Sequence, residues 1–106
     1  QKGNTSFRSK ADLSVNEKIG GDFEILSDRI KTDYGLSSGV IAKNIVDGGE
    51  LAKIGIYDNY IIIEVNGKPV NSQKDVEKIL ESYKGNVSIK FVDEYGRIYQ
   101  KGFKMP

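Results

Sequence analysis

The side chains that most often carry out covalent catalysis are missing from this sequence. Its 106 residues include no histidine and no cysteine, so it can assemble neither a Ser-His-Asp triad nor a thiol nucleophile. Acidic residues are plentiful, but those that stand in turn-like segments have no His or Cys partners and specify no metal: Asp47, Asp58, Asp93 and Glu94. We therefore expect a chain that is not an enzyme by itself and that holds no cofactor and no metal.

Length and charge restrict the partners further. The chain suits a single domain, and its net charge of +1 favours neither nucleic acid nor a charged membrane surface. The longest apolar run, Tyr60–Ile63, is far too short to span a membrane. Because the sequence begins at Gln1 rather than Met, we expect a mature or excised fragment, although residues left by a vector would look the same. The lack of Cys is compatible with either redox environment.

Residues 1–17 differ in composition from the rest. They are polar and rich in Ser and Asn, with no apolar period, so we expect a linker or flexible arm. One folded domain is then expected over residues 18–106.

The first half of that domain alternates short strands with short helices. A strand is expected around Phe23 and Ile25, and a helix capped by Ser27 or Asp28 follows it. The pattern then predicts a β-rich segment over 39–46, a helical turn over 50–54 ending at Gly55, a buried strand over 60–65, and a tight turn at Asn66-Gly67.

The second half contains the clearest helix. Ser72 and Asp75 have capping-box spacing, and an apolar face follows at helical intervals up to Gly85: Val76, Ile79, Leu80 and Tyr83. Strands are expected over 87–91 and 97–103, joined by a turn over 93–96. The fold class is α+β, mainly β: a small, partly open β-barrel or sandwich capped by one long and one or two short helices.

Several stretches resemble the PDZ family in its bacterial, HtrA-type arrangement. The stretch 38–45, SGVIAKNI, resembles a characteristic strand; 49–56, GELAKIGI, resembles the following short helix; and 60–70, YIIIEVNGKPV, resembles the central signature. The resemblance covers 18–104. Asn59-Tyr60, in place of Gly-Asp, and the polar arm point to the C-terminal PDZ domain of periplasmic HtrA/DegP-type serine proteases. Intramembrane metalloproteases, C-terminal processing proteases and secretion proteins carry similar domains.

The resemblance implies a site for peptides. PDZ domains bind an extended peptide as an added strand and hold its C-terminal carboxylate in a nest of backbone N–H groups. The carboxylate-binding loop would be Lys18-Ile19-Gly20-Gly21; the alternative is that Gly20-Gly21 is only a turn before a strand. The groove would be lined by one strand and one helix: Phe23, Ile25, Gln73, Val76, Glu77 and Leu80. Gln73 and Glu77 would form its rim, whereas Phe23, Val76 and Leu80 are equally compatible with a purely structural role in the core.

Two positions depart from the family pattern. Lys18 stands where Tyr or a small residue is usual, and Gly21 stands where a large apolar residue usually forms the pocket for the last peptide side chain. Either the pocket at Gly21 is enlarged or the groove no longer binds peptides well.

Two functions remain open at this stage. The first is a module that captures C-terminal or extended segments of a protein substrate, within a larger serine protease in the periplasm or cell envelope. The second is an assembly or regulatory domain of that protease with a vestigial groove. In both, the other domains of the parent chain are partners, and no nucleic acid and no membrane insertion are expected.

Overall fold

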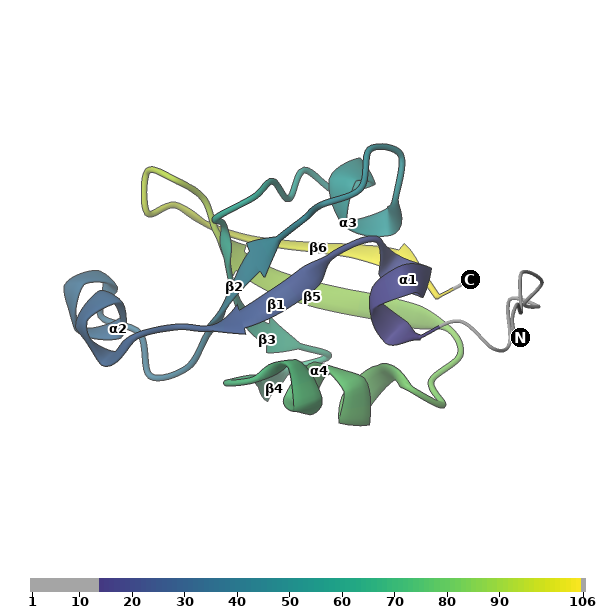
Figure 1. Cartoon of the computed structure of the whole chain (residues 1–106), viewed down its shortest axis with the longest axis horizontal. Coiled ribbons are helices and arrows are strands. Elements are labelled where there is room, and N and C mark those ends of the chain that lie inside the picture. The colour runs from purple at the N-terminus through teal and green to yellow at the C-terminus, as the bar shows by residue number, and fades with distance from the viewer. Residues whose placement is uncertain (1–13, 106) are drawn as a thin grey trace, which may run out of the picture.

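The computed structural model describes residues 14–105. Figure 1 shows its elements in chain order, and their bounds are as follows: α1 Val15–Ile19, β1 Asp22–Ile25, α2 Asp28–Tyr34, β2 Val40–Lys43, α3 Glu50–Lys53, β3 Ile61–Val65, β4 Lys68–Pro69, α4 Gln73–Leu80, β5 Asn86–Val92 and β6 Ile98–Lys104. No helix in the described part of the chain is long and apolar enough to cross a membrane.

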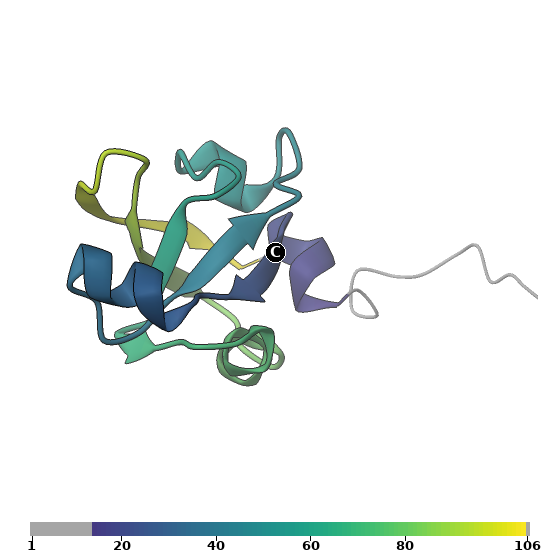
Figure 2. The same ribbon diagram turned by 60° about the vertical axis from the view of Figure 1, so that its left-hand side comes forward.

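The strands form one antiparallel sheet in the order β1-β2-β3-β5-β6, with β4 paired to β3. The sheet curls around the core but does not close, since β1 and β6 are its two edges. Helices α3 and α4 lie on opposite sides of the strands in both views (Figures 1 and 2). The α+β, mainly β fold class predicted from the sequence is confirmed.

The core has two parts. The larger cluster joins α1, α3 and α4 to the inner face of the sheet, with Ile19, Leu51 and Leu80 fully buried. A smaller cluster, which contains Leu26, Ile61 and Val92, lies on the other face beside α2. Strand β3 contributes to both, as predicted for a strand with three consecutive isoleucines.

Helix α1 begins before the domain boundary expected at Lys18. Ser14 accepts a hydrogen bond from the Glu17 backbone N–H at 3.2 Å, and the Glu17 carboxylate accepts one from the Ser14 N–H at 3.0 Å, a complete capping box. Val15 is only 5% exposed and belongs to the larger cluster. The boundary expected at residue 18 therefore falls inside a helix. Residues 1–13, most of the expected arm, lie outside the described residues.

Helix α4 starts where the sequence predicts and ends sooner. The Ser72 hydroxyl accepts from the Asp75 N–H at 3.2 Å, but the Asp75 carboxylate accepts from the Asn71 N–H rather than from Ser72. The helix ends at Leu80, not at Gly85. Tyr83 has the right spacing for the apolar face, yet it lies beyond the helix and donates its hydroxyl to the Asn86 carbonyl at 2.6 Å.

Candidate functional site

The first edge of the sheet carries backbone groups that its neighbouring strand does not use. Phe23 of β1 is opposite Ala42 of β2. The Ala42 N–H donates to the Tyr60 carbonyl at 2.8 Å, and the Ala42 carbonyl accepts from the Asn59 N–H at 2.7 Å. Phe23 and Ala42 are therefore a non-hydrogen-bonded pair, which turns the N–H and C=O of Phe23 away from β2 and toward α4. Ile25, two residues further along, has the same orientation.

The loop that leads into β1 brings two glycine N–H groups together. Gly20 caps α1 in the left-handed conformation, with φ of 82°, which Gly adopts without steric cost. The N–H groups of Gly20 and Gly21 both donate to the Asn16 carbonyl, at 2.8 and 3.2 Å. Two of the N–H groups predicted to hold a carboxylate, those of Gly20 and Gly21, therefore already have an internal acceptor, and the carboxylate nest stays a prediction.

A side-chain amide from α4 reaches across to the β1 edge. Gln73 Oε1 accepts from the Phe23 N–H at 3.3 Å and from Asn16 Nδ2 at 3.0 Å. Gln73 Nε2 donates to Asn16 Oδ1 and, at 2.8 Å, to Glu77 Oε2. Gln73 therefore joins α4, α1 and β1, and we call this set of contacts the Gln73 bridge.

Asp22 anchors the other end of the bridge. Its carboxylate accepts from Asn44 Nδ2 at 2.9 Å and from Asn16 Nδ2 at 2.8 Å. These two hydrogen bonds hold the pKa of the Asp22 carboxyl below its ordinary value, against a smaller opposing effect of burial. Asp22 is therefore ionised at neutral pH and fixes Asn16, which in turn fixes Gln73.

Solved structures with a similar fold include HtrA-type PDZ domains. The chain superposes on an HtrA-type protease AlgW variant solved with a decapeptide, with a TM-score of 0.69 over 82% of this chain at 14% identity. It superposes on the HtrA3 PDZ domain bound to a phage-derived ligand with a TM-score of 0.62, covering 80% of that chain at 17% identity. The chain has the fold of a PDZ domain.

Sequence comparison leads to the same type of protein. The chain is 36% identical over 61 residues to the human serine protease HTRA4, which corresponds to 54% of this chain and 13% of that protein. No family model matches the sequence. The chain spans only a small part of such relatives, including 27% of the AlgW chain.

The predicted loop and groove residues lie around the edge strand β1, but they differ in how exposed they are. Three of the groove residues belong to the larger core cluster and are 6% exposed or less: Phe23, Val76 and Leu80. Ile25 is 74% exposed. Gln73 and Glu77 are half-buried along α4, and in the loop Lys18 is half-buried whereas Ile19, Gly20 and Gly21 are buried. The groove assignment itself stays a prediction.

The space beside Gly21 is filled, contrary to the enlarged pocket considered above. A Cβ atom at Gly21 would lie 2.7 Å from Ile45 Cδ1 and 3.0 Å from Leu51 Cδ1. Ile45 comes from the segment between β2 and α3, and Leu51 comes from α3 itself. The missing side chain at this position is therefore compensated from inside the domain.

Sequence reasoning missed Asn16, which contacts Asp22, Gln73 and both loop glycines. The capping box of Ser14 and Glu17 was a readable signal for helix α1 and would have placed Asn16 within it. Its partnership with Gln73, 57 residues away, has no local signal.

Proposed function

We propose that this PDZ domain captures C-terminal or extended segments of protein substrates by adding them as a strand to β1, within a larger HtrA-type serine protease. The observation that carries the proposal is the Phe23 N–H, which points away from β2 and is met by a side-chain carbonyl at 3.3 Å. That carbonyl occupies the position that the backbone of an added strand would take. Two of the solved relatives are described with a decapeptide and a phage-derived ligand.

Binding would proceed by exchange of acceptors. The Gln73 amide leaves the Phe23 N–H, and a peptide carbonyl replaces it, so the number of hydrogen bonds is conserved. A terminal carboxylate then approaches the Gly20 and Gly21 N–H groups. The 3.2 Å bond from Gly21 is the longer of the two to Asn16 and is the easier to give up.

A second function, an assembly or regulatory domain with a vestigial groove, is favoured by the same bridge. Donors that an added strand would need are satisfied internally, and groove residues such as Leu80 are fully buried. In either case the protease domain would lie elsewhere in the parent chain, because this sequence has no His. A periplasmic or cell-envelope location rests on the family resemblance alone.

The two functions are separated by NMR titration of the 106-residue chain with a library of short peptides that have free C-termini. Peptide capture predicts saturable shifts of the Gly21, Phe23 and Ile25 amides. If no peptide shifts these amides at millimolar concentration, strand addition is refuted. A change in the oligomeric state of the parent chain on deletion of this domain, measured by light scattering, would then support assembly.

A further inference from the structure

A cavity of about 250 Å³ opens at the mouth of the curled sheet, away from the β1 edge. Its walls come from the end of α3, from Tyr60 before β3, and from the β5–β6 hairpin; none of its lining residues belongs to α1, β1 or α4. We call it the mouth cavity. Ligands often bind at the mouths of β-barrels, and a pocket that holds a drug-sized ligand has a volume of roughly 300–1,000 Å³. The mouth cavity is therefore suited to one ring or one side chain.

Three stacked rings form an apolar wall. Phe91 is buried between Tyr60, at a centroid distance of 6.2 Å, and Tyr99, at 5.6 Å, with interplanar angles of 22° and 30°. Tyr60 and Tyr99 are half-buried, and within residues 14–105 neither hydroxyl has a hydrogen-bond partner. Burial, together with the charges of Glu94 and Asp93, raises the pKa of the Tyr60 hydroxyl. Both tyrosines therefore offer O–H donors next to an aromatic surface.

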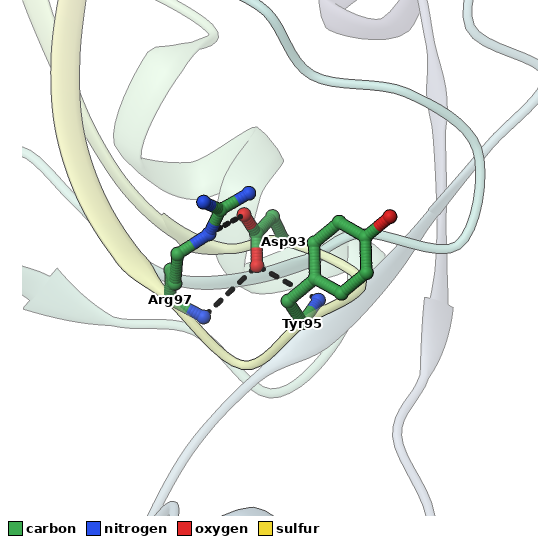
Figure 3. Close-up of polar contacts among 3 residues, drawn as sticks. All are labelled: Asp93, Tyr95 and Arg97. Atoms are coloured by element: carbon green, nitrogen blue, oxygen red, sulfur yellow. Dashed lines mark hydrogen bonds and ion pairs between the residues drawn. The ribbon is translucent and has the colours of Figure 1, made fainter.

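The acidic residue in the wall is already committed. The Asp93 side chain is 4% exposed and accepts from the Tyr95 N–H and the Arg97 N–H at 2.9 Å and from Arg97 Nε at 2.8 Å (Figure 3). Burial favours the protonated form of Asp93, but the donors of Arg97 and Tyr95 outweigh it and hold the pKa of the carboxyl below its ordinary value. Asp93 thus acts as an anchor for the hairpin and has little capacity left to bind a ligand.

The two cationic residues of the wall, Arg97 and Lys101, have N–H donors without a hydrogen-bond partner among the described residues. Arg97 is held through Nε by Asp93, and its guanidinium lies 5.0 Å from the Tyr95 ring centroid. Its two Nη groups make no hydrogen bond to any residue the structure describes, and the Lys101 ammonium has no ion pair there either. Within the described residues, the exposed Glu94 of the turn is a second acid whose charge acts on the Tyr60 hydroxyl. The mouth cavity therefore combines an aromatic surface with N–H and O–H donors, and the one carboxylate among its lining residues, Asp93, is already occupied.

We propose that the mouth cavity binds a carboxylate carried on an aromatic ring by a short spacer. The ring packs against Tyr60 and Tyr99, and the carboxylate accepts from Arg97 and Lys101, which are charged donors. This chemistry occurs both in free aromatic acids and at the end of a protein chain that terminates in Phe or Tyr. The site is separate from the β1 edge, so it stands whether or not that edge binds peptides.

Titration of the 106-residue chain by ¹⁵N–¹H NMR tests the proposal. Phenylacetate is the probe, benzylamine has the same ring with the opposite charge, and acetate has the carboxylate without the ring. We expect phenylacetate to shift the Gly55 and Lys101 amides saturably, and to bind at least about tenfold more tightly than either control, because both the ring and the charge contribute. N-acetyl-phenylalanine, compared with phenylacetate, reports whether a chain end or a free acid fits better.

A matched pair of variants locates the charge. Lys101→Gln should weaken phenylacetate binding about three- to tenfold through loss of one charged donor. Lys104→Gln removes a lysine from the same strand but from its opposite face, since the two are three residues apart, and should change binding less than about twofold. Three results would overturn the proposal: equal binding of the three probes, shifts at Gly21 and Phe23 in place of Gly55 and Lys101, or no effect of Lys101→Gln.

Discussion

Removal of the Gln73 bridge should strengthen peptide binding. A residue that only lines the rim of the groove and contacts the peptide would have the opposite effect. Gln73→Ala removes the carbonyl that accepts from the Phe23 N–H at 3.3 Å and leaves that donor free for an incoming strand. The wild-type domain must break this bond before it binds, whereas the variant begins with the donor open. The sign of the change therefore distinguishes a residue that blocks the edge from one that contacts the peptide.

The size of the effect follows from one neutral hydrogen bond. Such a bond contributes about 0.5–1.5 kcal/mol net, which corresponds to about two- to tenfold in affinity. The 3.3 Å separation is long for an N–H···O bond, so the lower part of that range applies, about two- to fourfold tighter binding. The variant also loses the contacts of Gln73 with Asn16 and Glu77, so a loss of stability of about 1 kcal/mol and a melting temperature lower by about 4–8 °C are expected.

Titration calorimetry with a five-residue peptide measures the affinity, and circular dichroism confirms that the variant is folded. Lys74→Ala is the control, because Lys74 is exposed on the same helix and takes no part in the bridge. Asn16→Ala should act in the same direction, since Asn16 holds the Gln73 amide in place. If a folded Gln73→Ala variant binds more weakly than wild type, Gln73 contacts the peptide and the blocking role is refuted.

Three other predictions concern stability. Gly21→Ile should destabilise the domain by about 1–3 kcal/mol, because its side chain would collide with Ile45 and Leu51; urea unfolding measures this, and unchanged stability would mean that these neighbours move aside at little cost. Val15→Ala should cost about 1–3 kcal/mol through lost burial in the core, and a melting temperature equal to that of wild type would place the start of the domain after α1. The lowered pKa of Asp22 means that its contribution is present above the ordinary Asp value of about 3.9 and is lost as the pH falls through the folded-state value. Asp22→Asn should therefore reduce the loss of stability between neutral and acid pH, and an unchanged slope of unfolding free energy against pH would contradict this.

Local signals in the sequence predicted much of the fold. The Asn66-Gly67 turn forms as expected, with φ of 54° and 76° at the two residues. Ser72 marks the start of α4 because a hydroxyl cap acts within three residues. The end of α4 was misplaced because Tyr83 continues the apolar spacing, although it lies beyond the helix and its side chain is exposed. Periodicity records which face is apolar and does not record where the backbone leaves the helix.

That the candidate residues lie close together was predictable from the sequence, whereas their contacts were not, and their role as a binding site stays a prediction. The order of the segments placed Gly20, Phe23 and Gln73 around one edge, and the structure brings them there. Gln73 accepts from the Phe23 N–H at the sheet edge because Asn16 holds its amide in place. The space beside Gly21 is filled because Ile45 and Leu51 pack there. These contacts join segments far apart in the chain, so no local pattern reports them.

The irregular pairing of β3 with β5 also bears on how such sequences should be aligned. Ile62 and Glu64 are paired with consecutive residues of β5, Phe91 and Lys90, so Ile63 between them is an additional residue without a partner there. This bulge lets Ile62 and Val65 face the larger core cluster while Ile61 and Ile63 face the smaller one. A related chain that lacks this one residue would keep every other β3–β5 pair unchanged. An alignment gap of one residue therefore belongs at Ile63, inside the strand, and not in the Asn66-Gly67 turn where gaps are usually placed.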